Sequence, residues 1–197
     1  SISDETIRGL LMFLNELHGR DYEREEFPNS CMKDLNHDYI FILPFSDQRS
    51  SLDLDQITPG LNELAQNVKK NKKLQKAASE LGEIYLGQGQ KLLHGDFYPK
   101  SWIQTQKGLY IIDPEFGFVG RPEFDLGVFL AHMAFTSHFL GAYLATKEYY
   151  HQKLDEDLLN GFTGVEILRR ILYVSQLPLD LDLTQKKKLI EIASDLV

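Results

Sequence analysis

Three acidic residues stand at the ends of two short apolar runs near the middle of the chain. Asp96 follows the apolar pair at 92–93, and Asp113 and Glu115 follow a second apolar run. Residues 104–108 between them are polar and end in glycine, which is typical of a hairpin connection. Because a hairpin brings its flanking segments together, we expect the three carboxylates to lie close to one another. Like charges repel unless a cation lies between them, so the pattern predicts a magnesium and phosphate site.

The residues around these carboxylates form two motifs. Residues 94–101 read His-Gly-Asp-Phe-Tyr-Pro-Lys-Ser, and residues 113–120 read Asp-Pro-Glu-Phe-Gly-Phe-Val-Gly. The pair resembles the catalytic core of the aminoglycoside phosphotransferase and choline kinase superfamily, and the second motif is similar to that of the 5-methylthioribose kinases. Phe-Asp-Leu-Gly at 124–127 and two arginines at 169–170 continue the similarity in the same order.

This resemblance implies an ATP- and magnesium-dependent small-molecule kinase with a protein-kinase-like fold. In such an enzyme Asp96 accepts the proton of the acceptor hydroxyl, and Asp113 holds magnesium with Glu115 and Ser101. Ser101 stands where most of the superfamily carries Asn, and its hydroxyl could also act through water. Asp113 and Glu115 are two residues apart, so an extended backbone would point both carboxylates to the same side.

Five further residues complete the predicted site. The resemblance implies that at least one of Arg169 and Arg170 binds the substrate or the transferred phosphoryl group. Adjacent residues on a regular helix diverge by about 100°, so the spacing predicts that the two arginines cannot both face one pocket. Tyr98 is expected to shape the acceptor pocket. His94 and Asp125 are expected to support and orient the catalytic loop rather than to react.

The identity of the acceptor is left open by departures from the family pattern. Tyr98 and Lys100 stand where the family has His and Gly, and Phe97 stands where it has Leu. These side chains flank the reacting hydroxyl. The first candidate acceptor is 5-methylthioribose, and the alternatives are an aminoglycoside, an amino alcohol or another sugar.

The sequence before His94 lacks the parts of a kinase that hold ATP. It contains no glycine-rich phosphate loop and no strand lysine of the Val-Ala-Ile-Lys type. We therefore expect residues 1–197 to form a single domain equivalent to the C-terminal lobe, with a catalytic and metal-binding hairpin at about 91–116 and no nucleotide lobe. A pseudokinase or binding module that has lost this lobe is the alternative outside the enzymes.

Hydrophobic periodicity predicts a mostly α-helical α+β domain. The first helix should span 7–17 after a cap at Ser3 or Asp4. Residues 39–43 are ambiguous between a strand and a buried turn, and 46–58 should form a loop. The other expected helices are 61–68, 73–86, one or two within 125–150, 165–175, and 184–196 capped by Thr184.

Composition excludes several classes of protein. A net charge of −8 argues against a nucleic-acid-binding surface. One cysteine, Cys31, excludes an internal disulfide framework and suits a reducing compartment. No apolar run reaches the length of a membrane span, so we expect a cytoplasmic protein that does not bind membranes. A homodimer and a place in methionine salvage are implied by the family resemblance alone.

Overall fold

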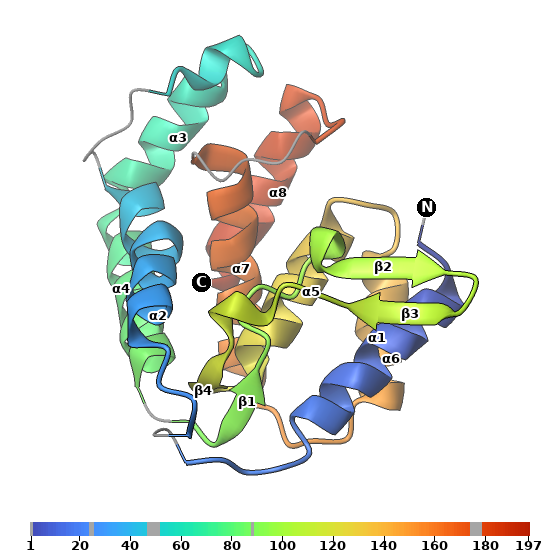
Figure 1. Cartoon of the computed structure of the whole chain (residues 1–197). Coiled ribbons are helices and arrows are strands. Elements are labelled where there is room, and N and C mark those ends of the chain that lie inside the picture. The colour runs from blue at the N-terminus through green and yellow to red at the C-terminus, as the bar shows by residue number, and fades with distance from the viewer. Residues whose placement is uncertain (1, 24–25, 47–51, 88, 174–178) are drawn as a thin grey trace.

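The computed structural model describes residues 2–23, 26–46, 52–87, 89–173 and 179–197. Helices dominate, and the strands are short (Figure 1). The α-helices are α1 (Asp4–Leu17), α2 (Ser30–His37), α3 (Leu61–Lys70), α4 (Lys72–Leu86), α5 (Glu123–Ala134), α6 (Phe139–Tyr149), α7 (Glu156–Leu172) and α8 (Leu183–Leu196). The strands are β1 (Lys91–Leu93), β2 (Trp102–Thr105), β3 (Gly108–Ile111) and β4 (Phe118–Gly120). The prediction of a mostly α-helical α+β fold is confirmed.

Among the described residues, five short helical turns connect these elements. Residues Asp38–Ile42 form the π-helical turn η2, and the other four turns are of the 3-10 type. They are η3 (Leu43–Phe45), η4 (Leu54–Gln56), η5 (Pro99–Ser101) and η6 (Pro114–Phe116). The ambiguous segment at 39–43 is thus helical rather than a strand. Within the predicted loop at 46–58, residues 47–51 lie outside the described residues and 54–56 form η4.

Local sequence sets most helix starts. Ser3 caps α1 by accepting a hydrogen bond from the Thr6 amide, as predicted. Helix α8 is capped by Asp182 in a capping box with Gln185, so the prediction of a Thr184 cap is wrong. The Asp182 carboxylate lies one position before the first helical residue, and it accepts from the Gln185 amide.

Two helices depart from the predicted pattern. Helix α7 begins nine residues earlier than expected, where Asp155 caps it. Gly161 and Gly164 obscure this early part, since glycine weakens a helical pattern. Helix α2 was not predicted, because its buried side chains are the polar Lys33 and Asn36 rather than an apolar stripe.

The strands form two separate antiparallel pairs. Strand β2 pairs with β3, with Trp102 opposite Ile111, and the turn between them holds residues 106–107. Strand β1 pairs with β4, with Leu92 opposite Val119. The predicted hairpin at 91–116 is therefore too wide, since only 102–111 form the hairpin. The two acidic motifs occupy the connections from β1 to β2 and from β3 to β4.

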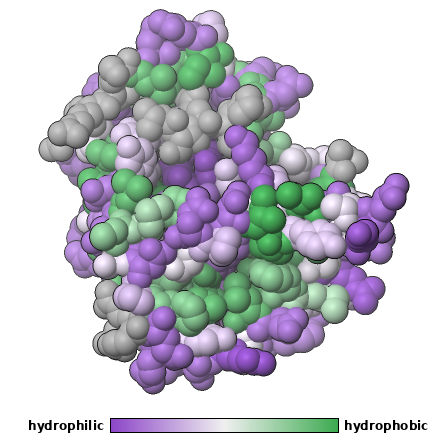
Figure 2. All heavy atoms as spheres, in the orientation of Figure 1, coloured by the Kyte–Doolittle hydropathy of each residue, from purple (hydrophilic) through white to green (hydrophobic). Residues whose placement is uncertain are grey.

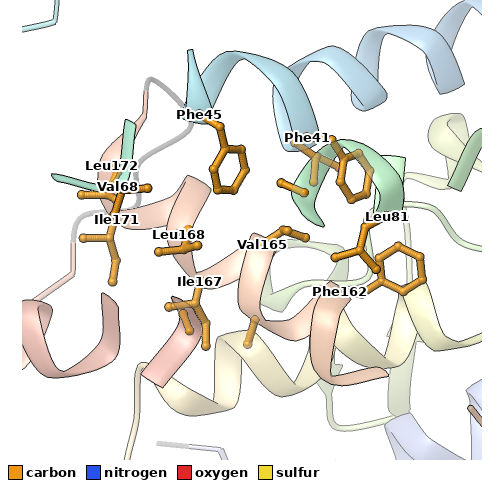
Figure 3. Close-up of a cluster of buried hydrophobic side chains, with 14 of the residues drawn as sticks. Phe41, Phe45, Val68, Leu81, Phe162, Val165, Ile167, Leu168, Ile171 and Leu172 are labelled. Atoms are coloured by element: carbon orange, nitrogen blue, oxygen red, sulfur yellow. The ribbon is translucent and has the colours of Figure 1, made fainter. Parts of the chain in front are cut away.

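Helix α7 lies at the centre of the main hydrophobic core. Its Phe162 lies beside Leu81 of α4 and Phe41 of η2, and its Leu168 lies nearer Phe45 of η3 (Figure 3). A fully buried Leu or Phe side chain contributes about 1.5–3 kcal/mol relative to an exposed one. This packing fixes α7, whose last turn carries the two arginines of the predicted site.

A second cluster joins α1 and α6 to the other side of α5. Leu10, Leu14, Phe97 and Phe129 are fully buried in it. The β2–β3 hairpin extends over α1 (Figure 1). Hydrophobic patches are exposed among hydrophilic side chains on the face shown in Figure 2. Within the described residues, no helix is both long and apolar enough to cross a bilayer.

Candidate active site

The loop after β1 carries Asp96 at the surface of a tightly packed backbone. Gly95 has φ +83°, and a Cβ at this position would lie 2.1 Å from the Phe116 carbonyl oxygen. Only glycine fits so close an approach. The two acidic motifs therefore touch at Gly95 and Phe116. The Asp96 side chain, which follows Gly95, remains 22% exposed.

Asp125 holds this loop from below. Its carboxylate is fully buried and accepts hydrogen bonds from the backbone amides of His94 at 2.7 Å and Gly95 at 2.9 Å. His18 donates a third hydrogen bond from Nε2 at 3.2 Å, and its Nδ1 accepts from the Tyr150 hydroxyl at 2.9 Å. Asp125 thus satisfies amides of the catalytic loop, and it lies inside α5 rather than at its N-cap.

The His94 ring joins the two acidic motifs. Its Nε2 lies 2.8 Å from the Ile112 carbonyl oxygen, which can only accept, so Nε2 donates. Its Nδ1 then accepts from the Asp96 amide at 3.4 Å. Both ring nitrogens bind backbone, and the ring is buried. His94 is placed to orient the loop.

Asp113 and Glu115 lie in a turn rather than in extended backbone. Asp113 has φ 59° and ψ 54°, in the left-handed region, and Glu115 belongs to η6. The expectation that an extended chain points them to one side is therefore wrong. Both side chains are exposed, and their carboxylate oxygens are of the kind that binds magnesium.

The three carboxylates do not form a compact cluster. Among the described residues, no three or more His, Cys, Asp or Glu side chains gather closely enough to hold a metal ion. The three carboxylates therefore do not form a metal site by themselves. The β1–β4 pairing and the left-handed turn at Asp113 set a different arrangement from a simple hairpin. Magnesium is usually held by one or two carboxylates plus substrate phosphates, and exposed Asp113 and Glu115 fit that donor set.

Ser101 is engaged inside the catalytic loop. Its hydroxyl donates to the Asp96 carbonyl oxygen at 2.9 Å, and its amide donates to the Tyr98 carbonyl oxygen at 2.8 Å. The side chain is 2% exposed. The structure therefore gives Ser101 a partner in the loop backbone, and its carbonyl oxygen accepts from the Ile112 amide at 3.0 Å, next to the turn of Asp113.

The side chains of Arg169 and Arg170 bind the same two carboxylates, those of Glu166 and Asp96. Both bind Glu166 one turn earlier in α7, Arg169 through Nε and Nη2 and Arg170 through Nε. On the other side, Asp96 Oδ1 lies 3.4 Å from Arg170 Nη2 and 3.9 Å from Arg169 Nη2. The prediction that the arginines cannot share a pocket is wrong, because their long side chains bend toward the same anions.

The charges in this cluster shift one another's pKa. Burial raises the pKa of Asp96, although Arg169 and Arg170 oppose the shift. Burial also acts to raise the pKa of Glu166, but the two arginines and a hydrogen bond from His132 hold it well below its usual value. Burial lowers the pKa of His132, so the neutral ring donates from Nε2 to Glu166 at 3.1 Å.

Tyr98 lies against the same arginine. The guanidinium carbon of Arg170 is 4.8 Å from the centre of the Tyr98 ring, within reach of a cation–π contact. The Tyr98 ring also lies beside the His132 ring, with ring centroids 5.3 Å apart. Burial raises the pKa of Tyr98, and the Asp96 charge adds to the shift.

A cavity of about 240 Å³ opens beside these groups. It is lined by Leu35, Asn36, Tyr39, Asp96, Phe116, Arg169 and Arg170. Apolar and charged residues therefore share its wall. Asp96 and both arginines, three of the residues singled out from sequence, meet in this one cavity.

Sequence reasoning missed several residues of this region. Glu166 precedes Arg169 and Arg170 by three and four positions, a spacing typical of ion pairs on a helix, so the sequence held a signal for it. Asn36 left no such signal, because its hydrogen bond to the Gly95 carbonyl oxygen at 3.1 Å joins segments far apart in the chain. His132 left no signal either, because its contact with Glu166 joins α5 to α7.

Comparison with known proteins agrees with the motifs. Residues 1–156 match the APH phosphotransferase enzyme family. The chain belongs to this family. Methylthioribose kinase of Bacillus pumilus is 32% identical over 136 residues, which cover 69% of this chain and 32% of that protein. Methylthioribose kinase 1 of rice is 34% identical over 76 residues, or 39% of this chain and 18% of that protein. The chain spans about a third or less of the length of these curated relatives.

The solved structure of another phosphotransferase has the same fold as this chain. It is a spectinomycin phosphotransferase in complex with ADP and spectinomycin, with a TM-score of 0.53 and 13% sequence identity. The alignment covers 100% of this chain and 67% of that one. The expectation of a kinase-like fold from this superfamily is confirmed.

Proposed function

We propose that this chain forms the catalytic and acceptor-binding lobe of a small-molecule kinase that moves the γ-phosphate of ATP to a sugar-like hydroxyl. The observation that carries the proposal is the cavity where Asp96 meets Arg169 and Arg170. Family membership and relatives named methylthioribose kinase support it. The glycine-rich loop and lysine that bind ATP phosphates would come from a nucleotide lobe outside residues 1–197.

In this proposal Asp96 acts as the proton acceptor. The acceptor hydroxyl oxygen attacks the γ-phosphorus, its proton passes to the Asp96 carboxylate, and ADP leaves. Burial raises the pKa of Asp96, which strengthens it as a base, while the charges of Arg169 and Arg170 oppose the shift. Positioning and charge stabilisation carry most of the catalysis in such reactions.

Magnesium would be held at the Asp-Pro-Glu turn. Asp113 is the first proposed ligand and Glu115 the second, since both offer exposed carboxylate oxygens. The cation would neutralise the phosphates of ATP. Ser101 is the third proposed ligand: its hydroxyl hydrogen is donated to the Asp96 carbonyl oxygen, which leaves the oxygen lone pairs for the metal, directly or through water.

The arginines favour a neutral or anionic acceptor. A cationic acceptor would place its ammonium beside two guanidinium groups, where like charges repel. The cavity is also below the roughly 300–1,000 Å³ of ordinary ligand pockets, so it suits a group of monosaccharide size. Leu35, Tyr39 and Phe116 add an apolar wall for a nonpolar substituent. Among the candidates, 5-methylthioribose fits best, ahead of an amino alcohol or an aminoglycoside.

The acceptor assignment is tested directly on the 197-residue chain. In an NMR titration, 5-methylthioribose should shift the amide signals of Asp96, Asn36 and Arg170, while ethanolamine and spectinomycin should not. Signals of α3, which lies away from this cavity, serve as the internal reference. Binding of ethanolamine but not of the sugar would contradict the assignment, and no binding of any acceptor would favour a module without this activity.

Kinase activity itself requires a nucleotide lobe. A chimera can supply it by placing the nucleotide-binding lobe of the Bacillus pumilus methylthioribose kinase in front of residue 1. We expect ATP-dependent phosphorylation of 5-methylthioribose by this chimera. A cytoplasmic homodimer in methionine salvage is the proposed setting, and it rests on the family resemblance.

A further inference from the structure

Two asparagine side chains, Asn29 at the N-cap of helix α2 and Asn36 within it, reach the two acidic loops. The Asn29 amide group donates to the carbonyl oxygens of Glu115 at 2.7 Å and Gly117 at 2.8 Å. The Asn36 amide group donates to the Gly95 carbonyl oxygen at 3.1 Å. One element thus binds both the turn of the proposed metal ligands and the loop that carries the proposed base.

Asn29 has an unusual conformation for this contact. It occupies the N-cap position of α2 with φ 31° and ψ 39°, in the left-handed region that Asn tolerates better than most residues. An N-cap Asn normally uses its side-chain oxygen to accept from an amide of its own helix. Asn29 makes no such capping bond. Its side chain instead donates to another segment, 86 and 88 residues away.

The helix between the two asparagines is firmly anchored. Lys33, midway between them, is 3% exposed and donates from Nζ to the Leu86 carbonyl oxygen at 3.3 Å. The same ammonium lies 4.6 Å from the centre of the Phe118 ring in β4. Asn29 lies at the N-cap, before the first helical residue, and Asn36 lies in the last turn of α2. The rigid helix between the two donors fixes the distance between the two loops that they bind.

We propose that Asn29 and Asn36 are positioning residues that set the separation between Asp96 and the Asp113–Gly117 turn. The inference rests on the proposed function, because that separation is the distance between proton acceptor and metal ligands. Asn36 also lines the acceptor cavity beside Asp96, so its amide group holds the loop at the site itself.

Amide hydrogen exchange on the 197-residue chain tests this without any need for activity. Asn36→Ala should speed exchange at 94–97 about two- to tenfold, the effect of losing one hydrogen bond. Asn29→Gly should do the same at 113–118, since glycine keeps the left-handed backbone and removes only the side chain. Should Asn36→Ala fail to fold, Asn36→Ser carries the same test. Unchanged exchange in both loops, or an equal rise throughout α7, would overturn the proposal.

Asn29→Asp separates positioning from helix capping. Asp caps helices as well as Asn does, so a capping role predicts that this variant behaves like the parent. A positioning role predicts faster exchange at 113–118 than in Asn29→Gly, because a carboxylate would face two carbonyl oxygens. The matched control is Asn71→Gly, which removes a true N-cap: Asn71 accepts from the Leu74 amide at the start of α4. This control should leave both loops unchanged.

Manganese alone, added as a paramagnetic probe, supplies a readout that a purely structural role would not move. In the parent we expect line broadening at 113–118 and, more weakly, at 94–97. In Asn36→Ala the ratio of broadening at 94–97 to that at 113–118 should fall at least twofold, and an unchanged ratio would overturn positioning. Absence of broadening in the parent would instead contradict the magnesium assignment, and the exchange data would still decide whether the asparagines position the loops.

Discussion

The strongest prediction about stability concerns the substitution Glu166→Gln. Glu166 is 1% exposed, and its carboxylate accepts hydrogen bonds from Arg169, Arg170 and His132. Glu166→Gln keeps the shape of the side chain and removes the charge. Two buried guanidinium groups would then have Asp96 as their nearest carboxylate, at 3.4 and 3.9 Å. We expect a large loss of stability with the fold retained.

The size of the loss follows from the burial of the cluster. Removing one partner of a buried ion pair costs about 3–5 kcal/mol, and the remaining amide oxygen of Gln places the loss for this variant at about 3 kcal/mol. A domain of this length loses about 2–4 °C in Tm per kcal/mol, so Tm should fall by about 6–12 °C. Glu80→Gln is the control. Glu80 forms an exposed pair with Lys76, which contributes at most about 0.5 kcal/mol.

The stabilising effect of Glu166 should change with pH in one direction. The pKa of Glu166 lies well below its usual value of 4.5, so its stabilising effect is complete above that pH and is lost as the pH falls through the folded pKa. The difference in unfolding free energy between parent and Glu166→Gln should be constant from about pH 5 upward and shrink below pH 4.5. Thermal and urea unfolding across this range measure it. A Tm change below about 2 °C, or a difference that grows on acidification, would refute the reasoning.

Three other predictions concern the site. The 197-residue chain alone should not turn over ATP at the roughly 1–100 per second of kinases, and such a rate would contradict the need for a separate nucleotide lobe. In the chimera, Asp113→Asn should weaken magnesium–nucleotide binding more than Glu115→Gln does, and unchanged affinities in calorimetry would remove the metal assignment. Arg170→Lys should weaken acceptor binding about tenfold, because a lysine cannot bind Glu166 and Asp96 together while stacking on Tyr98. An NMR titration of that variant with 5-methylthioribose checks the last prediction, and parental affinity would count against it.

Much of the fold was predictable where sequence signals are local. The apolar stripe from Ile7 to Leu17 and the Ser3 cap gave α1, and similar stripes gave α3 and α4. Helix α2 was not predictable, because it is held by polar contacts from Lys33 and Asn36 to distant segments. The width of the hairpin was also hidden, since the pairing of β1 with β4 depends on tertiary structure.

The residues of the site could be predicted from the sequence, but their geometry could not. The motifs identified Asp96, Asp113 and the arginine pair, because the residue types and spacing of a catalytic motif can be read directly from the sequence. Their geometry did not follow, since a helical wheel places Arg169 and Arg170 apart while flexible side chains bring them together on Glu166. The left-handed backbone at Asp113 likewise overturned an argument based on extended chain.

The most direct test of the central claim is the effect of Asp96→Asn in the chimera. The amide keeps the size and polarity of the side chain and cannot accept the proton. A positioned base contributes about 10²–10⁴-fold, so kcat should fall at least about 10²-fold while ATP affinity and thermal stability stay close to those of the parent. A variant that melts early yet keeps its normal kcat would contradict the claim and make Asp96 a structural residue of the turn.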